Sequence, residues 1–256
     1  SPVEGHARVR SRSTGERLRV AYLSADFRQH PVGYFIQHVI AAHARARFEV
    51  ICYSNSRKHD GLTDFIRAHA DRFTTVAGLS DEALAETIRN DGVDILVDLA
   101  GHTSGSRLPV LALRPAPLQM TWIGYLNTTG LSGVDYRVSD PYADPEENVL
   151  GTEQLLRLPE CFLSFGGFPA VAVDPQPACL RNGHVTFGSF NNLMKLTAPA
   201  VRLWADILKR VEGSRLVVMA VGAGSRTVHA RLSAEFAGHG VDPERLVLKE
   251  SLSREA

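Results

Sequence analysis

The sequence predicts an α/β protein with two parallel-sheet domains, the second of them cut short. Three observations lead to this prediction: short, nearly continuous apolar runs that suit strands buried on both faces, amphipathic stretches between these runs, and a Pro- and Gly-rich interval after which the alternation begins again. With 256 residues, 44% of them hydrophobic, the chain is long enough for one large or two small domains and too apolar to be disordered.

The first series alternates strands with helices. Strands are expected in LRVAYL (18–23), FEVICY (48–53), DILVDL (94–99), LQMTWIGY (118–125) and at 136–139. Helical periodicity is expected at about 33–45, 61–70 and 80–91. The last of these helices starts with a serine and has an acidic first turn, and both features stabilise the amino end of a helix.

The Pro- and Gly-rich interval extends from about 160 to 184 and has no sustained periodicity, which is typical of a connection between domains. A second series follows: a strand in VTFGSF, a helix at 198–211, a strand in RLVVMAV, a helix at 225–238 and a strand in RLVLKE. We therefore expect a linker over 1–17, a first domain over 18–165, an interdomain connection over 166–184 and the start of a second domain over 185–256.

Charge and cysteine content exclude several classes of protein. The formal net charge is +0 and the pI is about 7.1, so neither nucleic acid nor an anionic membrane is an expected partner. There is no apolar run of membrane-spanning length, and the polar start lacks the apolar core of a signal peptide. Cys52, Cys161 and Cys179 are widely spaced and odd in number, which suits a reducing cytosol. We expect a cytoplasmic protein.

In an open parallel sheet, ligands bind where strands end and loops lead into helices. Asp26 and His30 lie four residues apart in the loop after the first expected strand, with Pro31 and Gly33 opening a helix. A carboxylate and an imidazole at this point can position a hydroxyl and accept its proton. The alternative is structural: a helix-capping aspartate and a loop histidine.

Two further loops carry polar side chains of the same kind. One contains His102 and Thr103 within GHTSGSR, and the other contains Thr128 and Thr129 within GYLNTTG. Glycines permit a close approach of the backbone, and hydroxyl groups can bind a sugar or a phosphate. Both loops can equally be turns whose polar groups bond within the protein.

Lys195 follows the first strand of the second series and precedes a helix. A lysine there can neutralise a diphosphate leaving group, although an exposed lysine at the entry of a helix is the simpler interpretation. The sequence has no P-loop, no G-x-G-x-x-G after a strand, no D-x-D pair and no metal-ligand spacing of His and Cys. We therefore expect no metal and no cofactor, and protein cations must neutralise any diphosphate.

Five segments in order resemble the catalytic region of the O-GlcNAc transferase family (glycosyltransferase family 41), in its SPINDLY-type branch. They span about residues 18 to 250 and read RVAYLSADFRQHPVGYF, DILVDLAGHT, LRPAPLQMTWIGYLNTTGLSGVDYRVSD, EQLLRLPECFL and VTFGSFNNLMKLTAPAVRLWADILKRVEGSRLVV. The resemblance implies a GT-B fold, with two Rossmann-like domains facing each other across a cleft. It also implies metal-independent transfer of a sugar from a nucleotide to Ser or Thr hydroxyls of proteins, with inversion.

The resemblance also implies roles for single residues. Asp26 and His30 match positions near the donor sugar and the acceptor hydroxyl, and Pro31 and Val32 match the lining of the same pocket. Ile123 and Gly124 match residues that approach the sugar, and Asn192 and Lys195 match the pair that binds the diphosphate. The group that deprotonates the acceptor stays open among Asp26, His30, a water chain and the donor phosphate.

Departures from the family pattern limit this assignment. Val32 stands where Thr is frequent, Leu126-Asn127 replaces Pro-Gly, and Met194 replaces an aromatic residue. The chain also stops at Ala256, early in the second domain. We expect this piece to comprise the acceptor-side domain and the opening of the donor domain, to be inactive alone, and to follow tetratricopeptide (TPR) repeats in its parent.

The expected function is transfer of GlcNAc from UDP-GlcNAc to protein Ser and Thr hydroxyls. The alternatives are GDP-fucose-dependent protein O-fucosylation, transfer to a glycan or lipid acceptor, and a non-catalytic module that binds nucleotide sugar or acts as a scaffold.

Overall fold

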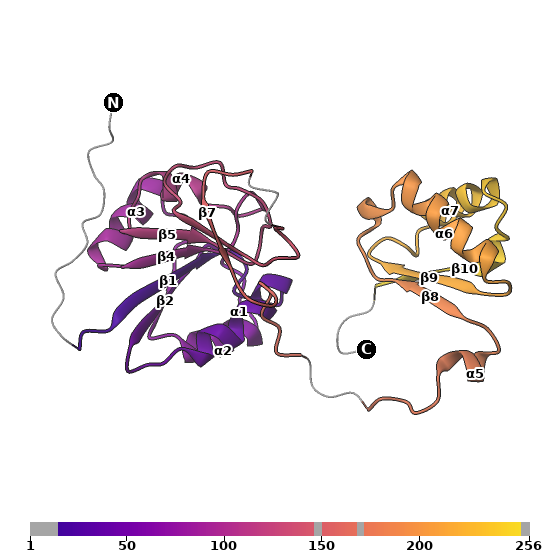
Figure 1. Ribbon diagram of the computed structural model, residues 1–256, viewed down its shortest axis with the longest axis horizontal. Helices are drawn as coiled ribbons and strands as arrows, with labels where there is room; N and C mark the ends of the chain where they lie inside the picture. Colours follow the sequence, from indigo (N-terminus) through magenta and orange to yellow (C-terminus); the bar gives the residue numbers. More distant parts are fainter. Residues whose placement is uncertain (1–14, 146–149, 168–171, 252–256) are drawn as a thin grey trace. The chain divides into compact units, whose positions relative to one another are not determined.

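The structure is a computed structural model that describes residues 15–145, 150–167 and 172–251 (Figure 1). Its internal contacts divide the chain into two compact units, 1–169 and 170–256. The division falls inside the Pro- and Gly-rich interval that the sequence predicts to be a connection, and most of the predicted linker over 1–17 lies outside the described residues.

The first unit contains a sheet of seven parallel strands in the order β3-β2-β1-β4-β5-β6-β7. The strands are β1 (Leu18–Ser24), β2 (Phe48–Ser54), β3 (Arg72–Thr75), β4 (Ile95–Asp98), β5 (Leu118–Thr121), β6 (Tyr136–Ser139) and β7 (Gln154–Arg157). From β1, strands β2 and β3 follow in sequence on one side. The chain then crosses to the other side of β1, where β4 pairs with its second edge and β5 to β7 follow outward. The loops after β1 and β4 therefore meet at a topological switch point.

Helices cover both faces of this sheet (Figure 1). They are α1 (Pro31–Ala42), α2 (Gly61–His69), α3 (Asp81–Asn90) and α4 (Leu108–Ala112). Side chains of β1 alternate between two cores: Val20 and Tyr22 pack with α1 and α2, whereas Ala21 and Leu23 pack with α3 and α4. A strand buried on both faces explains the unbroken apolar run from which it was predicted.

Local signals set the ends of the helices. Ser80 caps α3 by accepting a hydrogen bond from the Ala83 N–H at 3.2 Å, as its position in the sequence predicts. Helix α1 begins at Pro31, two residues before the predicted start, because proline suits the first helical position and His30 caps it. The alternative of an aspartate cap at Asp26 is wrong, since the capping residue is His30.

The second unit contains three parallel strands in the order β10-β9-β8. They are β8 (Thr186–Ser189), β9 (Arg215–Ala220) and β10 (Leu246–Glu250), with helices α5 (Ala178–Asn182), α6 (Ala198–Arg210) and α7 (Arg226–Gly238) and short 3-10 turns η1 (Leu193–Lys195) and η2 (Pro243–Arg245). Leu216 and Val218 of β9 point into a core formed with α6 and α7. Val217 and Met219 point to the opposite face and stay half-buried.

These two sheets confirm the predicted parallel α/β class, and several boundaries differ from prediction. The strand expected over 118–125 ends at Thr121, because Ile123 adopts a φ of +66°. There the Gly124 N–H donates to the Trp122 carbonyl at 2.8 Å, which closes a γ-turn. Strands β3 and β7 and helices α4 and α5 were not predicted. Within the described residues, no helix is long and apolar enough to span a membrane.

Candidate active site

A cavity of about 370 Å³ opens at the carboxyl ends of the central strands in the first unit. Loops after β1, β2, β4 and β5 build it, and the residues that line it are Ala25, Asp26, Arg28, His30, Val32, Ser56, Lys58, Thr103, Ser104, Gly105 and Gly124. It therefore lies at the switch point of the sheet, where open parallel sheets bind their ligands.

Asp26 is the most enclosed charged group of this cavity, with 8% of its surface exposed. Its Oδ1 atom accepts a hydrogen bond from Arg28 Nη2 at 2.8 Å, and its Oδ2 atom lies 3.5 Å from His30 Nδ1. The Asp26 N–H donates to Ser24 Oγ at 2.9 Å, which fixes the turn that leaves β1. One carboxylate oxygen is thus held by arginine, while the other faces the imidazole.

His30 contributes both to the cavity and to the start of α1. Its Nδ1 atom accepts a hydrogen bond from the Val32 N–H at 3.3 Å, so this nitrogen carries no proton and the proton of the neutral ring lies on Nε2. Burial lowers the pKa of His30; Asp26 opposes this effect and Arg28 adds to it. At neutral pH the ring is therefore uncharged and presents an N–H donor. If Nδ1 instead donated to Asp26, Nε2 would become a free base.

Two glycines allow the loops of the site to pack closely. A Cβ atom on Gly124 would overlap the carbonyl oxygen of Leu99, and one on Gly33 would overlap the carbonyl oxygen of Arg28. Ile123, beside Gly124, is 5% exposed in the left-handed region of φ, which is unusual for a β-branched residue. Its side chain belongs to the core, so the γ-turn presents backbone rather than side chain at the site.

The loop after β4 depends on Asp98, a fully buried carboxylate. It accepts hydrogen bonds from the N–H groups of Ala100 (3.2 Å) and Gly101 (2.7 Å) and from Thr121 Oγ1 (3.1 Å). Burial raises the pKa of Asp98, although these hydrogen bonds act in the opposite direction. Asp98 positions the loop that brings Thr103 to the cavity.

Three of the four further candidates brace loops instead of lining this cavity. His102 Nε2 donates to the Thr129 carbonyl at 2.9 Å. Thr128 Oγ1 donates to Glu153 at 2.7 Å, and both the N–H and the hydroxyl of Thr129 donate to the same carboxylate. Thr103 lines the cavity, but its hydroxyl donates to the Ala100 carbonyl at 2.7 Å.

The candidates of the second unit lie on η1, directly after β8. Asn192 Oδ1 accepts a hydrogen bond from the Met194 N–H at 2.9 Å and so caps this turn. Lys195 is exposed, and its Nζ atom lies 3.5 Å from Asn191 Oδ1. Lys195 therefore presents an ammonium group to solvent on a turn whose backbone is fixed.

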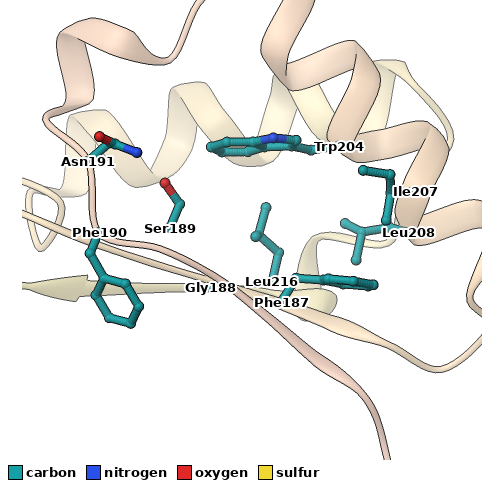
Figure 2. Close-up of a pocket in the computed structure, with 9 residues that line it drawn as sticks. All are labelled: Phe187, Gly188, Ser189, Phe190, Asn191, Trp204, Ile207, Leu208 and Leu216. Atoms are coloured by element: carbon teal, nitrogen blue, oxygen red, sulfur yellow. The ribbon is translucent and has the colours of Figure 1, made fainter. Parts of the chain in front are cut away.

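A separate cavity of about 470 Å³ lies in the second unit, between β8 and α6 (Figure 2). Phe187, Trp204, Leu208 and Leu216 form its apolar part, and Ser189 and Asn191 lie toward one end. Neither Asn192 nor Lys195 lines this cavity.

A model of glycosyl transferase family 41 matches residues 5–166. The chain belongs to this family. It is 40% identical over 237 residues to "Probable UDP-N-acetylglucosamine--peptide N-acetylglucosaminyltransferase SPINDLY" of Arabidopsis thaliana. The matched region covers 90% of this chain and 26% of the plant protein. It is 31% identical over 245 residues to the protein of the same plant whose name ends in SEC instead of SPINDLY. This second match covers 92% of this chain and 25% of the SEC protein.

A solved structure agrees with these relatives. A Lys-to-Met mutant of Thermobaculum terrenum O-GlcNAc transferase is 41% identical to this chain and superimposes on it with a TM-score of 0.88. The superposition covers 94% of this chain and 46% of the bacterial chain. Anabaena HepE in complex with UDP-glucose, at 8% identity and a TM-score of 0.51, shares the fold alone. The resemblance to O-GlcNAc transferases is thus confirmed, and this family 41 chain spans about a quarter of the curated relatives it matches.

The structure of this family 41 chain also adds residues that sequence reasoning missed. Arg28 and Lys58 line the first cavity, and Asp98 and Glu153 hold its neighbouring loops. A signal for Asp98 was present, because an acidic residue ends an apolar strand just before an Ala-Gly turn. Glu153 had no such signal. Among the described residues there is no group of three or more His, Cys, Asp or Glu side chains placed to hold a metal ion.

Proposed function

We propose that this chain is part of the catalytic region of a protein O-glycosyltransferase, which transfers GlcNAc from UDP-GlcNAc to Ser and Thr hydroxyls with inversion. The observation that carries the proposal is the Asp26–His30 pair inside the switch-point cavity of a family 41 chain. The names of the relatives, which are peptide N-acetylglucosaminyltransferases, support the choice of donor and acceptor.

In this reaction the acceptor oxygen attacks the anomeric carbon of the donor while the bond from that carbon to the diphosphate breaks. The hydroxyl proton passes to a base, and the diphosphate leaves with the bonding electron pair. Asp26 is our first candidate to receive the proton, directly or through water. His30 can receive it at Nε2 only in the tautomer whose Nδ1–H donates to Asp26, 3.5 Å away. We assign the first unit to the acceptor side on this basis.

The second unit supplies the positive charge that the leaving diphosphate requires. Lys195 carries an exposed ammonium group on the turn that Asn192 caps, close to the end of β8. A fixed cation stabilises charge that develops in the transition state, so the proposal needs no metal ion. We assign Lys195 and Asn192 to the diphosphate of the donor.

The full product of the gene tests this function through transfer of labelled sugar to a Ser-containing peptide, with UDP-GlcNAc and GDP-fucose as rival donors. We expect transfer from UDP-GlcNAc and a loss of about 10² to 10³-fold in kcat for Lys195→Ala. Lys209→Ala, which removes an exposed lysine from α6, is the matched control and should keep full activity.

Other results would reassign the protein. Transfer from GDP-fucose would make it a fucosyltransferase, and transfer only to glycans or lipids would change the acceptor class. Binding of a nucleotide sugar without any transfer would indicate a scaffold. The 256-residue chain tested alone is expected to bind acceptor peptide without turning over.

A further inference from the structure

A second cavity, of about 270 Å³, adjoins the candidate site in the first unit. It lies at the carboxyl ends of β2 and β3, and its walls carry three guanidinium or ammonium groups, those of Arg57, Lys58 and Arg67. Ser54, Ser56, Thr63 and Thr75 add hydroxyl groups, His59 adds an imidazole and Phe73 adds an aromatic ring. We call this cavity the basic pocket.

The basic pocket is positively charged and partly pre-organised. Within the described part of the chain, Arg57 and Lys58 form no ion pair. The Arg67 guanidinium lies 4.9 Å from the centre of the Phe73 ring, which fixes its direction. Asp64 offsets part of this charge, with Oδ1 3.8 Å from Arg67 and 2.6 Å from His59, but it does not line the pocket.

The basic pocket is continuous with the candidate site, because Ser56 and Lys58 line both cavities. The Lys58 N–H donates to Ser56 Oγ at 3.0 Å, so the shared wall is a fixed turn. An acceptor peptide that places a Ser or Thr hydroxyl beside Asp26 can therefore place one of its neighbouring side chains between Arg57 and Arg67 of the basic pocket.

We propose that the basic pocket binds an acidic side chain of the protein acceptor, a carboxylate or a phosphorylated residue close to the Ser or Thr that is glycosylated. Guanidinium forks match the oxygens of both groups, and the Phe73 ring offers an apolar wall for the methylene groups of a glutamate. This inference rests on the proposed function and adds a preference among its acceptors.

Fluorescence anisotropy with the 256-residue chain tests the preference. Three labelled peptides share one Ser and differ at one position three residues away, which holds Glu, phosphoserine or Gln. We expect the Glu and phosphoserine peptides to bind roughly fivefold or more tightly than the Gln peptide. In Arg57→Gln/Arg67→Gln this ratio should fall to about one while the Gln peptide binds as before.

The two substituted arginines line the basic pocket but not the candidate site, and both are exposed, so the variant should fold. The double variant Lys209→Gln/Arg231→Gln removes two exposed cations from the second unit and should keep the ratio. The single variant Arg57→Gln, which leaves the Arg67–Phe73 contact intact, should lower the ratio to an intermediate value.

Equal binding of all three peptides to the wild-type chain would overturn the inference and leave the proposed function standing, since sugar transfer is measured separately. An equal loss of the ratio in the control variant would also overturn it, because general charge would then be the cause. A third outcome would also show that the inference is wrong: UDP-GlcNAc displaces the Glu peptide from the wild-type chain, and the Arg57→Gln/Arg67→Gln variant no longer binds UDP-GlcNAc. The basic pocket would then bind the diphosphate of the donor.

Discussion

His30 caps α1 and lines the candidate site, so its protonation affects both. The lowered pKa means that the unfolded chain binds the proton more readily than the folded one. The contribution of His30 to stability is therefore full above its unfolded pKa of about 6.5 and is lost as the pH falls through the lower folded value. The site should be most intact at neutral pH.

The neighbours of His30 should shift its titration in opposite directions. Because Asp26 raises and Arg28 lowers the pKa of His30, Asp26→Asn should lower the NMR titration midpoint further and Arg28→Gln should raise it. The wild-type midpoint should lie below about 6.5. The same direction of shift in both variants would show that burial alone controls this imidazole.

Gly124 should tolerate no side chain. Gly124→Ala places a methyl group against the Leu99 carbonyl and should lower the free energy of unfolding by about 2 kcal/mol. Gly61→Ala is a suitable control, because a Cβ atom there would meet nothing within 4 Å beyond the adjacent residues and the backbone of its own helix. Urea denaturation measures both, and a similar loss in the two variants would contradict the close packing.

The sequence indicated some of these residues and not others. Asp26 and His30 are four residues apart after a buried strand, so their proximity follows from local geometry. Glu153, which binds Thr128 and Thr129, lies 24 residues from Thr129 along the chain, and the two meet only because β6 and β7 complete the sheet. Contacts that depend on sheet closure leave no local pattern.

At the scale of elements, strongly patterned segments were predicted well and marginal ones were missed. Helix α3 has a capping serine and a buried face, and it was expected within one residue at each end. Strand β3 has four residues, RFTT, that are half-buried or exposed; β7 also has four residues and α4 has five. Such segments gain their structure from the strands and helices beside them.

The turn after β4 should depend on Asp98. Asp98→Ala would leave the buried N–H groups of Ala100 and Gly101 without their acceptor and should cost about 2 kcal/mol of unfolding free energy. Amide hydrogen exchange should speed up at Gly101 and not at β2. Asp206→Ala, at an exposed ion pair on α6, is the control, and unchanged exchange at Gly101 would refute the role of Asp98.

The whole molecule has separate cores in its two units, and each unit holds one of the two tryptophans. Trp122 Nε1 donates to the Phe162 carbonyl at 2.9 Å in the first unit, whereas Trp204 borders the cavity of the second. Small cores stabilise a fold less than large ones do, so the second unit should be the weaker.

Thermal unfolding followed by tryptophan fluorescence should therefore show two transitions. Trp122→Phe leaves only Trp204 to report, and its transition should come at the lower temperature. Trp204→Phe leaves Trp122, which should report the higher one. Calorimetry of the wild-type chain should show the same two transitions, which would exclude the substitutions as their cause. A single coincident transition would show instead that the two units unfold together.

The place of β1 has a consequence for synthesis on the ribosome. Among the strands of this sheet β1 is synthesised first, yet it occupies the interior of the sheet, with β2 on one edge and β4 on the other. About 70 further residues must be translated between Ser24 and Ile95 before the second edge is paired, which takes roughly 4 to 14 s at bacterial and eukaryotic elongation rates. During that interval the nascent chain presents an apolar strand with an open edge, so chaperone binding should be concentrated before β4 leaves the exit tunnel.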